Sequence, residues 1–222
     1  MNRRIGITQR VSTRFHGAAH DCLDQAWSDL LLAMDYVPLP LPNLAGEEAL
    51  IASYLSGLDL SAVILSGGND IAGLSDDVAG SEVSPRRDAF EKQAILWARH
   101  NEVPILAVCR GMQYLNVVLG GQLKPIQGHA GTRHLLSTVE QNAGGCFAHL
   151  PDRFEVNSFH NFAVDEAGLA AGLLPVALDA NGNVEAYVHS HDRIAGMMWH
   201  PERTTPHSEL DMKTVRALID RA

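Results

Sequence analysis

The sequence has little positive charge, few cysteines and no long apolar segment. Its 222 residues include 17 Lys and Arg against 26 Asp and Glu, which gives a formal net charge of −9 at pH 7. That balance argues against an extended nucleic-acid-binding surface, although local basic residues could still hold a small phosphorylated ligand. The longest apolar runs, such as residues 30–34, are far too short to cross a bilayer. We therefore expect neither a nucleic acid nor a membrane as a partner.

Cysteine is sparse, with only Cys22, Cys109 and Cys146. An odd, small set fits a reducing cytoplasm better than a disulfide framework. The first residues lead directly into a strand pattern and lack the apolar core of a signal peptide. We therefore expect a cytoplasmic protein. Neither a P-loop nor a Gly-x-Gly-x-x-Gly motif is present, and no organic cofactor is implied.

Apolar segments and helical spacings alternate through the first half of the chain. Short apolar runs that indicate strands cover residues 4–9, 36–41, 62–65 and 103–108. Apolar residues recur at helical spacing over residues 23–34, 47–55 and 85–101. Ser84 and Pro85 are typical of a helix start, as N-cap and first helical residue. The alternation predicts a doubly wound, mostly parallel α/β sheet flanked by helices.

The second half of the chain has strand-like segments with no helical pattern between them. They cover residues 153–158, 176–179, 184–189 and 194–199, and residues 208–221 read as a closing helix. Residues 179–183 are typical of a hairpin turn. We therefore expect a smaller antiparallel β portion here. With no internal repeat or linker, residues 1–222 are predicted to form a single domain.

Cys109 is the strongest candidate for a catalytic residue. It stands between the apolar run 105–108 and the helix-like run 111–119, so a tight strand-to-helix turn would present it as a nucleophile elbow does. The positive end of the helix would favour the thiolate over the thiol. A single cysteine is more often buried and inert. Gly111, which permits the turn, and the downstream residues described next favour the nucleophile.

His200 and Glu202 are the predicted partners of Cys109. In an extended segment, residues two apart point to the same side, so the two side chains can act as base and orienter. Taken alone, they would be an ordinary histidine and an exposed glutamate at the end of a strand. Acyl transfer also needs hydrogen-bond donors for an oxyanion. The backbone N–H of Arg110 and the backbone of Gly67 and Gly68 are the candidates.

These motifs resemble the class I glutamine amidotransferase-like family. The Cys109 elbow, the His200-Pro201-Glu202 segment and the Ser66-Gly67-Gly68 segment occur in the family's order, from about residue 5 to about residue 202. The detail Cys-Arg-Gly-Met-Gln is more similar to the γ-glutamyl hydrolase branch, peptidase family C26. The resemblance implies a Cys109-His200-Glu202 triad, an oxyanion hole at Gly68 and Arg110, and a small-molecule γ-glutamyl substrate.

The resemblance also implies where the glutamyl head group binds. Gln113 lies one turn beyond Cys109, and its amide offers both a donor and an acceptor. Asn157, Ser158, Phe159 and His160 resemble the family's Asn-Ser-x-His segment, whose backbone would hold the head group. The family often has glutamine two residues after that histidine, whereas Phe162 stands here. Hydrogen bonding at the end of a strand is the other reading of Ser158 and His160.

The leaving group is suggested by three further segments. Residues 5–10, 24–27 and 64–70 together resemble γ-glutamyl-CDP-amidate hydrolases. These enzymes release cytidine diphosphoramidate in making the phosphoramidate decoration of bacterial surface polysaccharides. A diphosphate in an acidic protein needs local donors, and the candidates are Arg10, Arg14 and Arg87. Alternatively, these arginines only solubilise the loop.

Three other functions stay open at this point. A γ-glutamyl-γ-aminobutyrate or another γ-glutamyl amine is the next substrate, and the departure at Phe162 counts against it. A glutaminase subunit of an amidotransferase would need a synthetase partner and should be almost inactive alone. A non-catalytic module of this fold would not need the intact Cys109, His200 and Glu202. The oligomeric state does not follow from the sequence.

Two clusters and one loop have ordinary readings as well as functional ones. Residues 86–91 carry charges that usually form a solvated helix face, although Arg87-Asp88 also resembles a pair of the hydrolase branch. His189 and His191 could share a metal, but no cysteine or acidic cluster completes the set, so we expect no metal. Residues 69–83 read as a loop beside the glycines that could cover the site.

Overall fold

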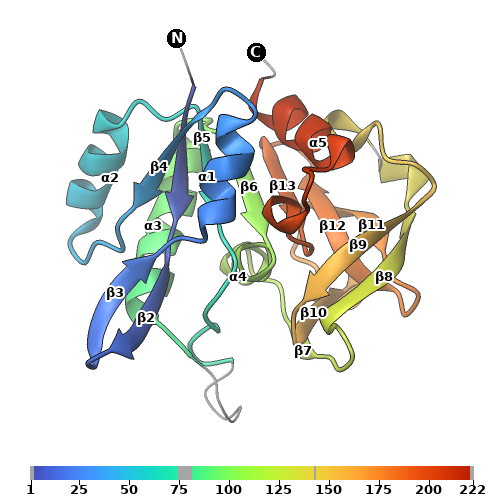
Figure 1. Ribbon diagram of the computed structural model, residues 1–222, viewed down its shortest axis with the longest axis horizontal. Coiled ribbons are helices and arrows are strands. Elements are labelled where there is room, and N and C mark those ends of the chain that lie inside the picture. Colours follow the sequence, from blue (N-terminus) through green and yellow to red (C-terminus); the bar gives the residue numbers. More distant parts are fainter. Residues whose placement is uncertain (1–2, 75–81, 143, 221–222) are drawn as a thin grey trace.

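The computed structural model describes residues 3–74, 82–142 and 144–220, which are built around one eleven-stranded sheet (Figure 1). The strands run in the order β4-β1-β5-β6-β13-β12-β11-β8-β9; off this path, β10 pairs with β12, and β7 pairs with β10. All pairs from β4 to β13 are parallel, and all pairs beyond β13 are antiparallel. The predicted α/β fold, with a parallel sheet flanked by helices and an antiparallel portion in the second half, is confirmed.

The elements have the following bounds. The helices are α1 Gln25–Leu32, α2 Glu48–Gly57, α3 Pro85–His100, α4 Arg110–Val118 and α5 Glu209–Ile219. The first strands are β1 Arg4–Thr8, β2 Arg10–Phe15, β3 Ala18–Cys22, β4 Val37–Leu41, β5 Ala62–Leu65 and β6 Ile105–Val108. The later strands are β7 Lys124–Pro125, β8 Ala130–Thr138, β9 Arg153–Phe159, β10 Phe162–Asp165, β11 Leu173–Leu178, β12 Asn183–His189 and β13 Ile194–Met197.

The parallel strands are apolar throughout because helices cover both faces of the sheet. In β5, Ile64 packs in one core cluster with side chains of α1 and α5. Val63 and Leu65 point to the other face and pack with side chains of α2, α3 and α4. Because β1, β5 and β6 are parallel neighbours, their carboxyl ends meet at one edge of the sheet. This edge carries the segments that the sequence assigned to function.

Helix α3 begins as predicted, but its charged residues do not face solvent. Ser84 caps the helix by accepting a hydrogen bond from the N–H of Arg87, and Pro85 occupies the first turn. Arg87 and Glu91 are fully buried, and Asp88 is nearly so. The prediction of a solvated helix face is therefore wrong for these three residues. They are buried because they pair with one another and with Arg110.

Three further features concern the edges of the fold. The β2–β3 hairpin, which the sequence did not predict, follows β1 directly and forms a separate two-stranded sheet. The central residues of the predicted covering loop, 75–81, lie outside the described residues, while Asp70 and Val83 on either side form an isolated bridge. No helix in the described part of the chain is long and apolar enough to cross a membrane.

Candidate active site

Cys109 lies at a sharp turn between β6 and α4. Its φ of 51° and ψ of −111° are unusual for a residue with a side chain, and its own N–H donates to the carbonyl of Met197 at 2.8 Å. The turn depends on Gly111, since a Cβ there would lie 2.2 Å from the carbonyl oxygen of Leu65. Helix α4 can therefore approach β5 closely enough to hold the thiol at the edge of the sheet. This geometry is that of the predicted elbow.

His200 and Glu202 lie next to Cys109. His200 Nδ1 is 2.7 Å from Glu202 Oε1, and both side chains are 2% exposed or less. Because the carboxylate accepts at Nδ1, Nε2 is the ring nitrogen left for the hydrogen bond between His200 and the Cys109 thiol. The structure thus brings together the three predicted side chains across 93 positions of sequence, from Cys109 to Glu202.

The thiol and the imidazole shift each other's proton affinity. Burial raises the pKa of Cys109, but the charge and hydrogen bond of His200, with smaller contributions from His160 and the Arg110 N–H, lower it by more in total. The pKa of Cys109 therefore lies below its usual value. Burial lowers the pKa of His200, but Cys109 and Glu202 together raise it to about 9. Both shifts favour the thiolate–imidazolium pair over the neutral thiol and imidazole.

Asn157 holds the backbone of His200 in place. Its Nδ2 donates to the His200 carbonyl at 2.9 Å, and its Oδ1 accepts from the His200 N–H at 2.8 Å. A side-chain amide that makes both bonds fixes the peptide on each side of the imidazole. The side chain of Asn157 therefore lies behind the predicted base, and a role for this residue in binding the glutamyl head group stays a prediction.

The glycine segment after β5 faces the same site. A Cβ on Gly67 would lie 2.7 Å from His200 Cε1 and 3.6 Å from Cys109 Cβ, so only glycine leaves room between them. Gly68 has a φ of 80°, which a residue with a side chain rarely adopts. The backbone here can approach a substrate closely, as the predicted oxyanion role requires.

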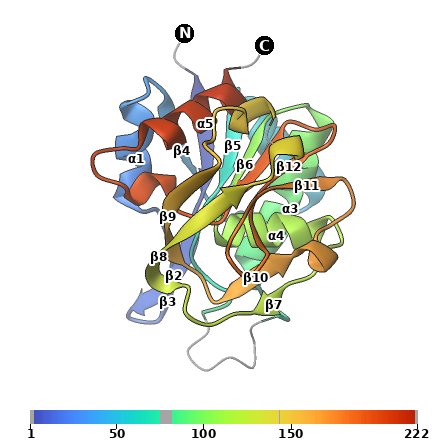
Figure 2. The same ribbon diagram turned by 90° about the vertical axis from the view of Figure 1, so that its right-hand side faces the viewer.

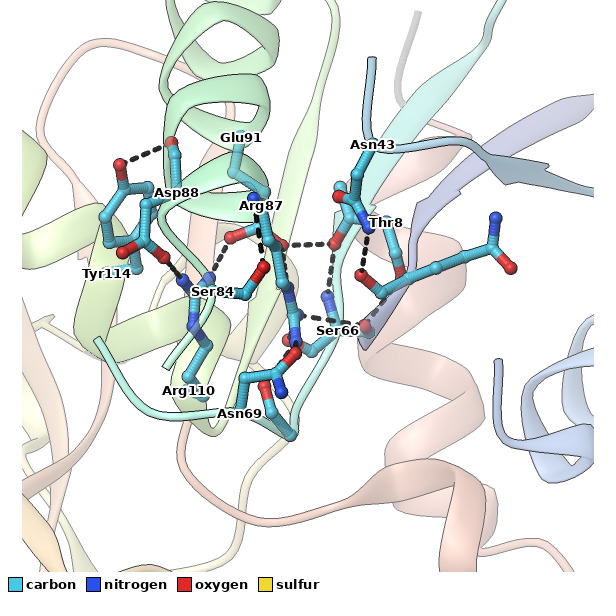
Figure 3. Close-up of polar contacts among 12 residues, drawn as sticks. Thr8, Asn43, Ser66, Asn69, Ser84, Arg87, Asp88, Glu91, Arg110 and Tyr114 are labelled. Carbon is cyan, nitrogen blue, oxygen red and sulfur yellow. Dashed lines mark hydrogen bonds and ion pairs between the residues drawn. The ribbon is translucent and has the colours of Figure 1, made fainter. Parts of the chain in front are cut away.

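Arg87 supports the glycine segment from behind (Figure 3). Its guanidinium donates to the carbonyls of Ser66, Gly67 and Gly68. These bonds turn the carbonyls toward the interior of the protein. Arg87 thus lies behind the glycine segment. It does not face the site, as its candidacy as a donor to a diphosphate would require.

Arg87 belongs to a buried ionic network that joins α3, α4 and β1. Glu91 accepts from Arg87 Nε at 2.9 Å, from Thr8 Oγ1 at 2.6 Å and from Arg110 Nη1. Arg110 also pairs with Asp88 (Figure 3). The side chain of Arg110 thus faces the interior while its N–H begins α4 beside Cys109. The network connects both candidate oxyanion donors, Gly68 and Arg110, through charged groups that are shielded from water.

A pocket of about 280 Å³ opens beside His200 and the glycine segment. Arg10 and Arg203 contribute the positive charge of its lining. Arg10 packs its stem against Gly68, and no hydrogen bond or ion pair with another described residue occupies its guanidinium. Arg203 lies over the ring of Phe159 at 5.0 Å, with Nε 3.4 Å from Asp24 Oδ2. The pocket therefore offers cationic donors next to the predicted nucleophile and base.

Arg14 does not line this pocket. It lies on the β2–β3 hairpin, where its side chain is 72% exposed and pairs with Glu82 at 3.1 Å. Arg203, which the sequence analysis did not single out, takes the second cationic position. Its position in the sequence could have predicted this, because Arg203 directly follows Glu202 and a residue next to the predicted triad lies near the same site.

The other predicted glutamyl contacts are directed at protein atoms. Gln113 Nε2 donates to the Phe162 carbonyl at 2.8 Å, and Ser158 Oγ donates to the His129 carbonyl at 2.5 Å. His160 Nδ1 is 2.8 Å from the Phe162 carbonyl, and its Nε2 is 3.3 Å from His129 Nδ1. The ring of Phe159 is 43% exposed and meets the His200 ring edge-on at 5.5 Å. A role for these residues in substrate binding stays a prediction.

The histidines that could hold a metal are not the pair suggested by spacing. His189 Nδ1 accepts the backbone N–H groups of His191 and Asp192, so this nitrogen belongs to a local turn. A different group, His129, His134, His160 and Glu185, places one ligand atom from each residue within 4.8 Å of the others.

Comparison with known proteins identifies the family. A model of the peptidase C26 family matches residues 4–202. The chain belongs to the peptidase C26 family. A relative named gamma-glutamyl-CDP-amidate hydrolase, from Campylobacter jejuni, is 33% identical over 204 residues, which cover 90% of each chain. The gamma-glutamyl-gamma-aminobutyrate hydrolase of Escherichia coli O157:H7 is 26% identical, covering 90% of this chain and 86% of the relative.

A solved structure shows the same fold. The crystal structure of a glutamine amidotransferase from Thermotoga maritima superposes with a TM-score of 0.66 at 19% identity, covering 97% of this chain and 81% of that one. The resemblance to class I glutamine amidotransferases and to the C26 branch, predicted from the motifs around Cys109 and His200, is confirmed.

Proposed function

We propose that this peptidase C26 protein is a cysteine-dependent hydrolase that cleaves a γ-glutamyl amide bond. Cys109 is the nucleophile, His200 the acid and base, and Glu202 the orienter. The observation that carries the proposal is the contact between the elbow thiol and His200, whose charge lowers the pKa of Cys109 while its own rises to about 9. A buried, inert cysteine would have no such partner.

The reaction follows from this geometry. The Cys109 thiolate attacks the γ-carbonyl carbon, and the N–H groups of Gly68 and Arg110 stabilise the oxyanion that forms. When the C–N bond breaks, the His200 imidazolium gives its proton to the leaving nitrogen, and a thioester remains. Neutral His200 then takes a proton from water, the resulting hydroxide attacks the thioester, and glutamate leaves as the thiolate–imidazolium pair reforms.

We assign the glutamyl head group of the substrate to the side of Cys109 that lies away from Arg10. We infer that Gln113 and the backbone of Ser158 and Phe159 bind the α-amino and α-carboxylate groups, with His160 nearby. Both charged groups need polar partners in a closed site. The proximity of His160 to Cys109 supports this, because its charge contributes to the pKa of the thiol.

The leaving group is proposed to be cytidine diphosphoramidate. The pocket that opens at His200 is lined by Arg10, whose guanidinium has no partner among the described residues, and by Arg203, which also pairs with Asp24. In a chain with a net charge of −9, two arginines at one pocket suit a diphosphate better than a single carboxylate. The identity shared with the Campylobacter protein supports the same substrate. We therefore place this enzyme in the cytoplasm, in the synthesis of a phosphoramidate-decorated surface polysaccharide.

A competition assay tests this function. Purified enzyme is given γ-glutamyl-CDP-amidate and γ-glutamyl-γ-aminobutyrate together, and the release of each amine is followed. We expect a higher kcat/KM for the nucleotide, and no turnover of either by Cys109→Ala. Equal or better turnover of γ-glutamyl-γ-aminobutyrate would remove the nucleotide and leave a γ-glutamyl amine hydrolase. Almost no turnover of either amide, or of glutamine, by the folded enzyme alone would favour a glutaminase subunit that needs a synthetase partner instead.

Arg10 and Arg14 provide a matched pair for the leaving group. Both arginines follow β1, but only Arg10 lines the pocket, whereas Arg14 pairs with Glu82. A charged hydrogen bond contributes about 1.5–3 kcal/mol, so Arg10→Gln should raise KM for the nucleotide substrate roughly tenfold or more. Arg14→Gln should leave KM almost unchanged. Equal effects of the two substitutions would contradict a specific contact at Arg10.

A further inference from the structure

The strands of the antiparallel half bring together four side chains of the types that can ligate a metal ion. His134 lies on β8, Glu185 on β12, His129 directly before β8 and His160 directly after β9 (Figure 2). Three of the four residues are at least nine-tenths buried, and His134 is 18% exposed at its side chain. The first and last of these residues, His129 and Glu185, are 56 positions apart, so no short sequence motif predicts the cluster.

The distances within this cluster match those between the ligands of one metal ion. His129 Nδ1 is 3.3 Å from His160 Nε2, and His134 Nε2 is 3.3 Å from Glu185 Oε2. Glu185 Oε1 is 3.4 Å from His160 Nε2 and 3.9 Å from His129 Nδ1. Ligands about 2.1 Å from a tetrahedral zinc ion are themselves about 3.4 Å apart. The printed pairs are therefore close to the separation that a tetrahedral ion requires, and one ligand atom from each of the four residues lies within 4.8 Å of the others.

Hydrogen bonds outside the cluster leave acceptor atoms facing inward. His160 Nδ1 must carry its hydrogen, because its partner, the Phe162 carbonyl, only accepts. In neutral His160, Nε2 is then an acceptor that faces His129 Nδ1. His129 Nε2 in turn faces Asp179 Oδ2 at 3.4 Å. With His160 neutral, either neutral tautomer of His129 leaves two acceptors facing each other, on its inner side or at Asp179. A second proton on His129, a second proton on His160 directed at Glu185 Oε1, or a cation in the cluster removes this repulsion.

Glu185 adds a buried carboxylate to the same point, and its Oε2 lies 3.3 Å from His134 Nε2. Its Oε1 is buried and accepts no hydrogen bond of good geometry from the described residues. A buried carboxylate oxygen without a donor is costly, whereas a cation would satisfy it. The outer partners are those that metal-ligating histidines commonly have, a backbone carbonyl for His160 and a carboxylate for His129.

We propose that His129, His134, His160 and Glu185 bind one divalent transition-metal ion, with Zn²⁺ as the natural occupant. Three imidazoles and one carboxylate suit zinc, whereas Ca²⁺ and Mg²⁺ prefer oxygen ligands. Four protein ligands fill a tetrahedron, so this ion is structural. It clamps β8, β9 and β12 together and fixes the end of β9, from which Asn157 holds the backbone of His200. This site differs from the pair His189 and His191 and replaces the expectation of no metal.

The test measures metal binding directly and needs no turnover. The Cys109→Ser variant is used as the parent, because the thiol beside His200 would itself bind zinc. The parent is stripped with a chelator and titrated with Zn²⁺ against a chromophoric chelator. We expect one equivalent to bind and the melting temperature to rise. Co²⁺ should give the strong visible bands of a tetrahedral site without a thiolate charge-transfer band.

Three further variants are compared in the Cys109→Ser background. Glu185→Gln keeps the shape of the ligand but removes its charge, and His134→Ala removes the most exposed ligand. Each should weaken Zn²⁺ binding roughly 100-fold or more, because even outer partners of metal ligands contribute 10–100-fold. His191→Ala, on an exposed residue outside the cluster, should bind as the parent does. Circular dichroism without metal checks the folding of each variant.

Several outcomes would overturn the site. No stoichiometric binding by the Cys109→Ser parent would mean that a proton, and not a metal, occupies the cluster. Undiminished binding in Glu185→Gln and His134→Ala, or a loss only in His191→Ala, would place the ion elsewhere. If a cluster variant fails to fold, the stoichiometry and the Co²⁺ spectrum of the parent still decide, since a thiolate band would assign the ion to Cys22 or Cys146.

Discussion

At the residue scale, the reactivity of this site depends on one proton shared between Cys109 and His200. Below the pKa of Cys109, which His200 holds under its usual value, the thiol is protonated and the nucleophile is lost. Above about pH 9, His200 loses the proton that the leaving nitrogen needs. We expect kcat/KM to be bell-shaped, with an alkaline limb near pH 9. A profile that still rises above pH 9 would contradict the ion pair.

The same pairing can be observed without turnover. In Cys109→Ala the thiolate that raises the pKa of His200 is gone, although Glu202 remains. The pKa of His200, followed by NMR of its ring protons, should therefore fall from about 9 in the wild-type protein to a lower value in the variant.

Glu202 and His200 should differ in their importance. His200→Ala removes the group that moves the proton, so kcat should fall by several orders of magnitude. Glu202→Gln keeps a partner at Nδ1 but loses the charge that stabilises the imidazolium, so its loss should be smaller. Single-turnover kinetics of both variants make the comparison. A larger loss in Glu202→Gln would mean that the roles are assigned wrongly.

At the element scale, the buried ionic network holds α3, α4 and the glycine segment in register. Glu91 has two arginine partners and is fully buried, so Glu91→Ala removes the carboxylate that pairs with Arg87 and leaves Arg110 with Asp88 alone. Breaking a buried pair in this way typically lowers the free energy of unfolding by about 3–5 kcal/mol. Glu155→Ala, which breaks the exposed pair with Arg133, should change it by about 1 kcal/mol or less. Urea denaturation measures both, and similar losses would contradict the argument.

The elements that the sequence predicted are those with local signals. Strands β5 and β6 are continuous apolar runs, and α3 begins at a Ser-Pro cap. Strand β8 lacks such a signal, because most of its residues are exposed and only one is buried, and its conformation depends on pairing with β9. The burial of the charged residues in α3 could not be predicted from local sequence either. It depends on Arg110, a residue from another helix, reaching Glu91 and Asp88.

The site follows the same division. Cys109, Arg10 and the glycine segment follow the carboxyl ends of β6, β1 and β5, and the topology of a parallel sheet brings such positions together. The placement of Arg203 in the pocket and of Arg87 behind the glycine segment depends on side-chain directions that only the packed structure determines.

At the scale of the whole molecule, a net charge of −9 opposes a diphosphate substrate, while Arg10 attracts it locally. Both effects are Coulombic and weaken with salt, since the screening length falls from about 10 Å at 0.1 M to about 3 Å at 1 M. The ratio of KM in Arg10→Gln to KM in the wild-type enzyme isolates the local contribution, because the global charge is almost the same in both.

For γ-glutamyl-CDP-amidate, the ratio of KM in Arg10→Gln to KM in the wild-type enzyme should be largest at low salt and should shrink as salt is added. For an uncharged γ-glutamyl amide it should stay close to one at every salt concentration, because no phosphate meets Arg10. Initial rates of glutamate release for two enzymes and two substrates over a salt series provide the measurement. A ratio that is independent of salt for the nucleotide would mean that Arg10 shapes the pocket by packing against Gly68, and not by its charge.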